Sequence, residues 1–323
     1  MREIRVSRFG GPEVLELIDD LPRPTPGAGE LLVDVAAAGV GWLDTRIRAG
    51  QAPSVFEVTL PFVPGSAVSG QVSAVGPGVD RDWVGTAVVT HAIGGYGGGY
   101  SDTVVAAADA TYSIPLGLDH RAALAVLDDG STALALLENT PVAPGDLVLV
   151  QPGLGGLGSL LAQLVARAGA QVIAAVAGAE KVSHAKRSGF AVVDYSAPDF
   201  TGQVVAVTGG RPLNVVFDGI GGALGAAALA LIGDGGRFCG YGMTSGTETV
   251  VEAAHRQRLT VTDMSQLPSF WADAPRRIRQ VLTEAAAGRL LPLIGQTYPL
   301  TDAARAHADI EARSVVGKSV LLR

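Results

Sequence analysis

Short apolar runs and turns alternate through the first third of the chain. Val, Leu and Ala dominate each run, and clusters of Gly and Pro such as 24–27 and 76–78 separate one run from the next. Runs of this kind between turn residues are typical of antiparallel strands. The pattern predicts a small, curved, mostly antiparallel β domain with strands near residues 31–36, 68–75, 84–91 and 103–107.

From about residue 121 the pattern changes to apolar runs that alternate with helical periodicity. The runs 146–151 and 171–176 are apolar on both faces, with a helical segment between them. Strands of this type belong to a parallel sheet that helices cover on both sides. Further strands are expected at 191–194, 215–218, 237–240 and 259–262, and helices at 158–168 and 181–187.

The tail predicts two helices, at 274–287 and 301–312, and a final strand at 319–322. A strand after two helices favours a return of the chain to the first β domain. We therefore expect an α/β protein of two domains: residues 1–120 with 266–323 form the β domain, and residues 121–265 form a doubly wound parallel sheet.

Composition narrows the class of protein. A length of 323 residues exceeds what one hydrophobic core usually supports. One cysteine excludes a disulfide within the chain and a Cys-rich structural zinc site. The net charge of −7 argues against nucleic-acid and anionic-membrane partners. The most apolar stretch, 147–179, is broken by glycines, and the N-terminus has no signal-peptide pattern, so we expect a cytoplasmic protein.

The strongest local motif is the run PGLGGLG at 152–158. It directly follows the strand 146–151 and directly precedes a helix. A dinucleotide pyrophosphate needs glycine at this point, because the backbone must approach it and the helix N-terminus offers free N–H groups. No Gly-Lys-Ser/Thr follows, which excludes a P-loop. The alternative interpretation is tight packing of helix against strand, without a ligand.

The second strand of this region bears on the choice of dinucleotide. NAD sites place Asp or Glu about 20 residues after the glycine turn. Here the strand 171–176 is followed by Ala177, Gly178 and Ala179, and Lys181 lies on the next turn. A missing carboxylate and a nearby cation favour the 2′-phosphate of NADP, although Glu180 beside Lys181 weakens the inference and Lys181 can also be an ordinary surface residue.

Metal ligands are not indicated. The histidines (His91, His120, His184, His255 and His307) are scattered without ligand spacing, and Cys239 lies within a predicted strand. We expect no metal site.

Several motifs, in order along the chain, resemble one known family. Residues 38–50 (AGVGWLDTRIRAG) are similar to a segment of the zinc-free quinone oxidoreductases, the zeta-crystallin-like branch of the medium-chain dehydrogenase/reductase superfamily. The runs RFGGPEVLEL, LPFVPGSAVSGQVSAVGPGV, NVVFDGIGG, GRFCGYG and the tail from TYPLTDAARAHADIEAR to GKSVLL agree with the same family.

The resemblance implies a GroES-like catalytic domain, a Rossmann domain and NADPH as cofactor. It implies that Gly155, Gly156 and Leu157 hold the pyrophosphate, and that Gly178, Lys181 and Tyr195 lie at the adenosine phosphate. The remaining cofactor positions it implies are Thr132, Gly219, Gly240, Tyr241, Gly242 and Arg313, with Gly41, Trp42 and Met243 at the substrate.

This chain departs from the family pattern near the expected chemistry. Gly41 replaces an Asn, Ala67 a Glu and Met243 another Asn, and Asp129 and Asp263 stand at positions that relatives fill differently. The departures favour a specialised pocket, widened at Gly41 and more acidic.

Hydride transfer is cofactor chemistry, so the protein mainly positions the reactants. The anion formed in the acceptor still needs a proton, and the candidate donors are Asp44 and Tyr96, with Tyr100 as an alternative. Asp44 can equally be a structural hydrogen-bond acceptor, and His91 at a strand end is interpreted as structural.

Three functional hypotheses follow. The first is a zinc-independent NADPH-dependent reductase of quinones or other α,β-unsaturated carbonyls. The second is an enoyl or enone reductase for a bulky specialised metabolite. The third is an NADPH-binding protein with weak catalysis. We also expect a homodimer, formed through the end strands of the parallel sheet.

Overall fold

The computed structural model describes residues 1–52, 56, 58–93, 97–263 and 271–323. The chain divides into two compact units, one formed by Met1–Asp128 with Ile278–Arg323 and the other by Asp129–Arg277. The first boundary lies within the long helix α2 (His120–Asn139), and the second within α8 (Ala274–Ala286). The expected domain limits at 120/121 and 265/266 stay a prediction.

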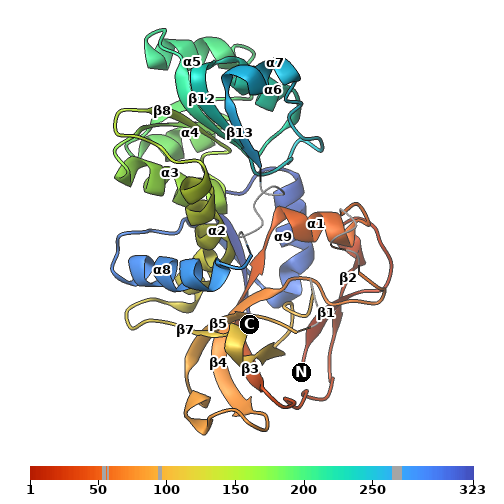
Figure 1. Cartoon of the computed structure of the whole chain (residues 1–323). Coiled ribbons are helices and arrows are strands. Elements are labelled where there is room, and N and C mark those ends of the chain that lie inside the picture. Colours follow the sequence, from red (N-terminus) through yellow and green to blue (C-terminus); the bar gives the residue numbers. More distant parts are fainter. Residues whose placement is uncertain (53–55, 57, 94–96, 264–270) are drawn as a thin grey trace. The chain divides into compact units, whose positions relative to one another are not determined.

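The unit Asp129–Arg277 contains a six-stranded sheet in the order β10-β9-β8-β11-β12-β13 (Figure 1). Every neighbouring pair in it is parallel. The strands are β8 (Leu147–Gln151), β9 (Gln171–Val176), β10 (Ala191–Asp194), β11 (Leu213–Asp218), β12 (Ile232–Gly240) and β13 (Thr260–Asp263). The order reverses between β8 and β11, which is the arrangement of a doubly wound Rossmann sheet.

Helices connect these strands and cover both faces of the sheet. They are α3 (Gly156–Arg167), α4 (Ala179–Lys186), α5 (Phe200–Thr208), α6 (Gly222–Ala230) and α7 (Ala253–Arg258). Because parallel crossovers are right-handed, α3 and α4 lie on one face and α6 on the other (Figure 1). All six predicted strands of the sheet are present, whereas the helices α2, α5, α6 and α7 were not predicted.

The other unit contains a sheet in the order β14-β15-β3-β4-β5-β7, with β6 paired to β3. Its pairs are antiparallel except β14 with β15. The strands are β3 (Glu30–Val40), β4 (Ala67–Val75), β5 (Ala87–His91), β6 (Thr103–Ala107), β7 (Tyr112–Ser113), β14 (Ile294–Pro299) and β15 (Lys318–Leu322). The last strand β15 pairs with β3, so the tail does return to the first sheet.

A two-stranded ribbon and two helices complete this unit. The ribbon pairs β1 (Glu3–Val6) with β2 (Leu15–Ile18), and the helices are α1 (Trp42–Arg48) and α9 (Ala303–Glu311). Residues 300–302 form a separate 3-10 turn, so the helix predicted at 301–312 begins later than expected. The fold class predicted from the sequence, a Rossmann sheet with a mostly antiparallel GroES-like domain, is confirmed.

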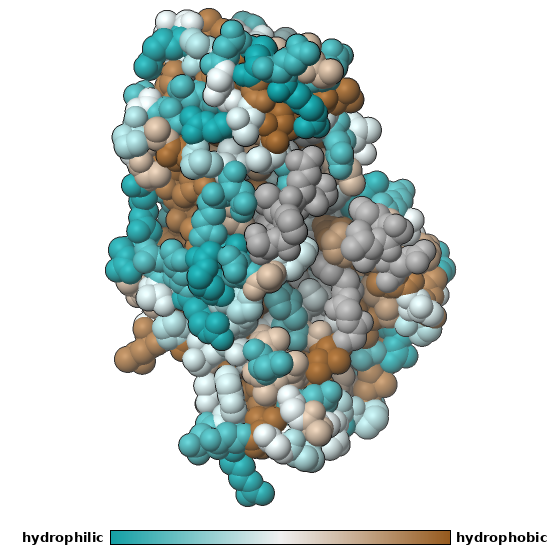
Figure 2. All heavy atoms as spheres, viewed as in Figure 1, coloured by the Kyte–Doolittle hydropathy of each residue, from teal (hydrophilic) through white to brown (hydrophobic). Residues whose placement is uncertain are grey.

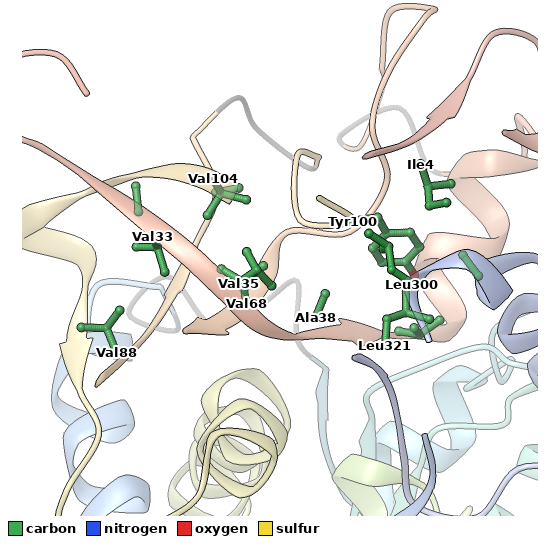
Figure 3. Packing of buried hydrophobic residues seen from close by; sticks show 14 of the residues in the cluster. Ile4, Val33, Val35, Ala38, Val68, Val88, Tyr100, Val104, Leu300 and Leu321 are labelled. Atoms are coloured by element: carbon green, nitrogen blue, oxygen red, sulfur yellow. The ribbon is translucent and has the colours of Figure 1, made fainter. Parts of the chain in front are cut away.

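One apolar core joins distant segments of the β unit. Figure 3 shows Val33, Val35 and Ala38 of β3 and Val68 of β4 in the same cluster as Leu321 of the tail. Each of these side chains is buried. Val33 and Val35 face the same side because side chains alternate along a strand. The irregularity between Val35 and Ala37 shifts this alternation before Ala38. The parallel sheet has its own core, built from β8, β9, β11 and the helices against them.

Helix α8 shows the amphipathic pattern that its sequence predicts. Ile278, Val281, Leu282 and Ala285 are buried, while the residues between them are largely polar. Figure 2 shows hydrophilic residues gathered over the outer side of this helix. Among the helices that the structure describes, none is both long and apolar enough to cross a membrane.

Candidate functional site

Helix α3 begins directly at the glycine turn that follows β8. Its N-cap, Gly155, has an extended backbone and no side chain to cap the helix. A Cβ on Gly158 would overlap the carbonyl oxygen of Pro152, so only glycine lets α3 lie this close to the turn. At Gly155, by contrast, the one described atom that a Cβ would meet is Pro152 Cγ, at 3.8 Å. The first-turn N–H groups have no acceptor within the helix, which makes this turn suited to a dinucleotide pyrophosphate.

The carboxyl ends of β9 and β10 meet at Gly178 and Tyr195. The backbone N–H of Tyr195 donates to Val176 at 2.9 Å, and that of Gly178 donates to Asp194 Oδ1 at 3.0 Å. Gly178 has a φ of 86°, which favours glycine. Lys181 follows in the first turn of α4. The structure thus brings Gly178 and Tyr195 together at this edge of the sheet.

The acid at this edge is Asp194, at the end of β10. Its Oδ1 accepts from Gly178 and also from the backbone N–H and hydroxyl of Ser196, at 2.9 and 2.6 Å. Burial raises the pKa of Asp194, but these hydrogen bonds outweigh it and the pKa is lowered. The end of β9 itself carries no carboxylate, as the sequence predicted.

A buried polar network lies where β8 and β11 end. Asp218 Oδ1 accepts from Gln151 Nε2 at 2.9 Å and from the N–H groups of Ile220 and Gly221 at 2.9 and 3.1 Å. Its Oδ2 accepts from the hydroxyl of Thr249. Asp218 therefore holds the turn that contains Gly219 in one conformation.

Tyr241 closes the same network from the loop after β12. Its hydroxyl donates to the Gln151 carbonyl at 3.1 Å, and its ring covers Gly219 so closely that a Cβ there would overlap it. Burial and the nearby Asp218 charge raise the pKa of Tyr241 well above its usual value, so the hydroxyl stays protonated. Gly242 lies beside the Gly219 carbonyl.

The remaining predicted residues of this unit are placed individually. Gly240 ends β12, Met243 lies two residues beyond Tyr241, and Thr132 lies on α2. Of the predicted cofactor residues, Gly219, Gly240, Tyr241 and Gly242 are therefore gathered at the carboxyl ends of β11 and β12.

In the β unit, Asp44 caps the helix on which it lies. Its Oδ2 accepts the backbone N–H of Gly41 at 2.7 Å, and only 6% of the residue is exposed. Burial raises the pKa of Asp44 to about 6, although the Gly41 N–H and the Lys318 charge act in the opposite direction. A cap of this kind is the structural role considered from the sequence, and a pKa near neutrality is also what a proton donor needs.

Other predicted residues of the β unit differ in their placement. Trp42 begins α1 and its ring lies 5.6 Å from the guanidinium of Arg46. Arg313 follows α9 with a φ of 55°. Tyr96 lies outside the described residues. Tyr100 is buried, and its hydroxyl contacts His307 Nε2 at 3.0 Å, which points to a structural role.

Two polar pairs were not predicted from the sequence. His91 Nε2 lies 2.9 Å from Asp128 Oδ1, and Gln151 bonds to the buried Asp218. The signal for both is a polar residue at the end of an apolar run, as in VVTH and VLVQ. This signal does not predict the partners, because they lie 37 and 67 residues away along the chain.

Potential metal ligands are dispersed. In the described ranges, no group of three or more His, Cys, Asp or Glu side chains is arranged to hold a metal ion. Cys239 is buried in β12, and burial raises the pKa of its thiol despite hydrogen bonds to Thr262 and Thr140.

Comparison with known proteins matches this geometry along the whole chain. Residues 27–116 match the alcohol dehydrogenase GroES-like domain, and residues 190–321 match a family described as zinc-binding dehydrogenase. A quinone oxidoreductase of Pseudomonas aeruginosa is 33% identical, over 99% of both chains. The chain belongs to the quinone oxidoreductases. This family is part of the medium-chain dehydrogenase/reductase superfamily, as the motifs predicted.

Two further relatives bear on the chemistry of this quinone oxidoreductase. The structure of Escherichia coli quinone oxidoreductase complexed with NADPH has a TM-score of 0.88, with 28% identity over 100% of both chains. A 2-haloacrylate reductase of a Burkholderia species is 30% identical, over 98% of this chain and 97% of its own. The protein is an NADPH-dependent oxidoreductase, and the open N-terminus of α3 fits that cofactor.

Proposed function

We propose that this quinone oxidoreductase reduces a quinone or another α,β-unsaturated carbonyl compound with NADPH, without zinc. The observation that carries the proposal is the Gly155–Gly156 turn at the N-terminus of α3, followed by a strand β9 that ends without a carboxylate. Such a turn accepts a pyrophosphate, and the missing acid leaves room for a 2′-phosphate. The names of the Pseudomonas and Burkholderia relatives support conjugated acceptors.

Each predicted cofactor residue has a proposed role. The backbone of Gly155, Gly156 and Leu157 binds the pyrophosphate, and Lys181 and Tyr195 bind the 2′-phosphate beside Gly178. The ribose and nicotinamide half lies against the turn held by Asp218, and Arg313 stays a proposed cofactor residue. The residues proposed for the nicotinamide half are Thr132, Gly219, Gly240, Tyr241 and Gly242.

When bound, NADPH supplies the hydride. The chain itself must orient the acceptor and hold a proton for the anion that results. Asp44 is the proposed donor, because its pKa of about 6 lets it carry a proton and release it near neutral pH. Tyr96 stays the second proposed donor.

Gly41 gives the proposed acceptor site its size. Among the described residues, a Cβ at Gly41 would meet only Asp44 Oδ2, at 3.5 Å, so these residues leave space for a larger side chain there. With Trp42 and Met243 as the other proposed pocket residues, this favours acceptors larger than a simple benzoquinone. The specific alternative is therefore an enone reductase for a bulky metabolite.

Steady-state NADPH oxidation tests the proposal. The acceptor panel contains a benzoquinone, a naphthoquinone, a small enone, a bulky cyclic enone and a haloacrylate, each with and without a strong chelator. Turnover of a naphthoquinone that survives chelation is expected. Turnover of enones alone would select the bulky-enone alternative, and tight NADPH binding without turnover of any acceptor would select the weakly catalytic hypothesis. Loss of activity on chelation, restored by zinc, would refute zinc independence.

We further propose a cytoplasmic homodimer. Among the described strands, β13 is the last in the order of the six-stranded sheet, and an edge strand can pair with a second copy. Light scattering of the purified protein measures this directly, and a monomeric mass at micromolar concentration would contradict it.

A further inference from the structure

The strands β3, β4, β5 and β15 bring two titratable residues, His91 and Lys318, to one end of the sheet in the β unit. In the ladders, Ala67 at the start of β4 pairs with His91 at the end of β5, and Ser319 pairs with Val40 at the end of β3. Lys318 precedes Ser319, and its Cε would lie 3.3 Å from a Cβ on Gly39. The register therefore places His91 and Lys318 at the sheet end from which the chain continues to Gly41 and Asp44.

His91 forms an ion pair with Asp128 of helix α2. Nε2 and Oδ1 are 2.9 Å apart, while 38% of the His91 side chain and 48% of the Asp128 side chain stay exposed. Because an ionised carboxylate only accepts hydrogen bonds, Nε2 is the donor. No hydrogen bond is formed by Nδ1 within the part of the chain that the structure describes. The imidazole is thus held by a carboxylate at Nε2, and 38% of the side chain is exposed.

The charges around the pair keep it ionised. Burial lowers the pKa of His91, but the charge and hydrogen bond of Asp128 outweigh this, and the pKa is raised even against Lys318. Burial raises the pKa of Asp128, but His91 and then Lys318 outweigh it, and the pKa is lowered. His91 therefore carries a proton further into the neutral range than a free histidine does.

The charges of Asp128 and Lys318 also act on Asp44. Asp128 raises the pKa of Asp44, and Lys318 lowers it. Asp44 is enclosed, with 6% of its surface exposed, whereas His91 is partly exposed, with 38% of its side chain accessible. The two groups are therefore suited to different steps of proton delivery, since Asp44 is sheltered from solvent and the His91 side chain is accessible to it.

We propose that the His91–Asp128 pair is the proton supply of the site, replacing on each turnover the proton that Asp44 gives up. This inference rests on the proposed function. The acceptor anion takes the Asp44 proton, leaving a carboxylate. Protonated His91 gives its proton through water to that carboxylate, and neutral His91 then takes a proton from bulk water. Asp128 is a positioning residue, because it holds the imidazole and favours its charged form.

A purely structural role is the competing interpretation, since the pair also ties β5 to α2. The two interpretations differ in timing. A proton supply acts between turnovers, so its loss slows repeated turnover and spares the first one. A structural tie would affect both turnovers equally, together with stability and NADPH affinity.

The experiment compares His91→Gln, Asp128→Asn and the control His255→Gln, which alters a histidine of α7 in the other unit. Stopped-flow measurement with the NADPH-loaded enzyme and a naphthoquinone separates the first turnover from the steady state. His91→Gln is expected to lower kcat by about tenfold, which is less than the ~10²–10⁴-fold loss of a complete acid–base deletion, because Asp44 itself stays in place. The first turnover and the KM for NADPH should stay unchanged, and the control should match the wild type.

Two readouts report on the proton itself. In Asp128→Asn, the fall of kcat with rising pH should begin at lower pH, and NMR titration of the His91 ring should show the same lowered pKa. For His91→Ala, added imidazole should restore steady-state turnover, since a small base can replace a proton carrier but not a structural tie.

The possible failures are distinguishable. One outcome is that the wild type turns over and His91→Gln keeps its kcat and pH profile. This outcome would overturn the proton supply and leave the reductase function intact. Equal loss of the first and later turnovers, without rescue by imidazole, would favour the structural tie and overturn the inference. Absence of turnover by the wild type on the whole acceptor panel would overturn the proposed function and, with it, the supply.

Discussion

The side-chain amide of Gln151 donates to the carboxylate of Asp218, at 2.9 Å, across the ends of two neighbouring parallel strands. Both residues are buried, with 0% and 1% of their surface exposed. Two backbone N–H groups and one hydroxyl share the same carboxylate. The bond therefore fixes the turn at Gly219 against the end of β8, where the proposed nicotinamide half lies.

Replacing Asp218 by alanine should destabilise the protein and weaken NADPH binding. It leaves several buried donors without an acceptor, at a cost of about 1–3 kcal/mol each in the unrelaxed limit. Asp218→Asn keeps one oxygen and should cost less. Urea unfolding and NADPH titration measure both effects, and Asp234→Asn, at an exposed ion pair, is the control. Equal stability of Asp218→Ala and the wild type would contradict the role of the network.

The two glycines of the turn should respond differently to alanine. Gly155→Ala has space for its Cβ, so the free energy of unfolding should change little while NADPH affinity falls, because the methyl group enters the proposed pyrophosphate site. Gly158→Ala overlaps the Pro152 carbonyl and should lower both stability and affinity. Thermal unfolding and NADPH titration separate the cases, and unchanged affinity in Gly155→Ala would argue against the proposed site.

Lys181→Ala tests the choice of dinucleotide. A charge-assisted bond to a phosphate is worth about 1.5–3 kcal/mol, so the Kd for NADPH should rise by about ten- to hundredfold. The Kd for NADH, which lacks the 2′-phosphate, should stay constant. Lys186→Ala, at the end of the same helix, is the matched control. A parallel loss of affinity for both cofactors would show that Lys181 does not contact the 2′-phosphate.

Asp44→Asn separates the cap from the proton donor. The pKa of Asp44 is raised to about 6, so ionisation in the folded state is unfavourable, and this cost is absent below the ordinary pKa of 3.8 and fully present above about 6. The variant should therefore gain stability relative to the wild type as pH rises through that window, because it never ionises. If Asp44 is the donor, kcat should fall by about 10²-fold or more. Unchanged kcat would assign Asp44 to the cap alone.

His307 should make the β unit sensitive to acid. Burial, followed by the charge of Arg48, lowers its pKa to about 3 from 6.5. The unfolded chain then binds more protons between these values, so stability falls as pH drops from 6.5 toward 3. His307→Gln should reduce this fall when unfolding is followed by circular dichroism, whereas His184→Gln, on the exposed side of α4, should not. If His307→Gln and the wild type lost stability equally as the pH fell, His307 would not be the cause of the acid sensitivity.

Strand content was the most predictable part of the fold, since alternation and apolar runs are local. The strand at 103–107 coincides with β6, and all strands of the parallel sheet were found within a few residues. Helix α2 was missed, because its buried residues follow one another at 123–127 and 133–136 instead of forming a single stripe. Strand β14 was missed because Gly295 and Pro299 are residue types that are depleted in strands.

The residues of the candidate site also fall into a group that the sequence predicts and a group that it does not. The glycine turn, Gly178 and Gly41 are recognisable from sequence, because each depends on neighbours within a few residues of the chain. The pairs Gln151–Asp218 and His91–Asp128 are not, because their partners meet only when strands far apart in sequence become adjacent.

The sequence by itself determined that the protein is an α/β protein of two parts and that it belongs to the quinone oxidoreductases. It also indicated a dinucleotide with a 2′-phosphate. These conclusions rest on local patterns and on the order of motifs along the chain. Only the tertiary structure decided which charged groups surround Asp44 and how they shift its pKa. It buried Asp44 enough to raise its pKa to about 6 and set Asp128 and Lys318 around it. The physical reason is that desolvation and Coulomb interactions depend on distances in space, which the order of residues along the chain does not contain.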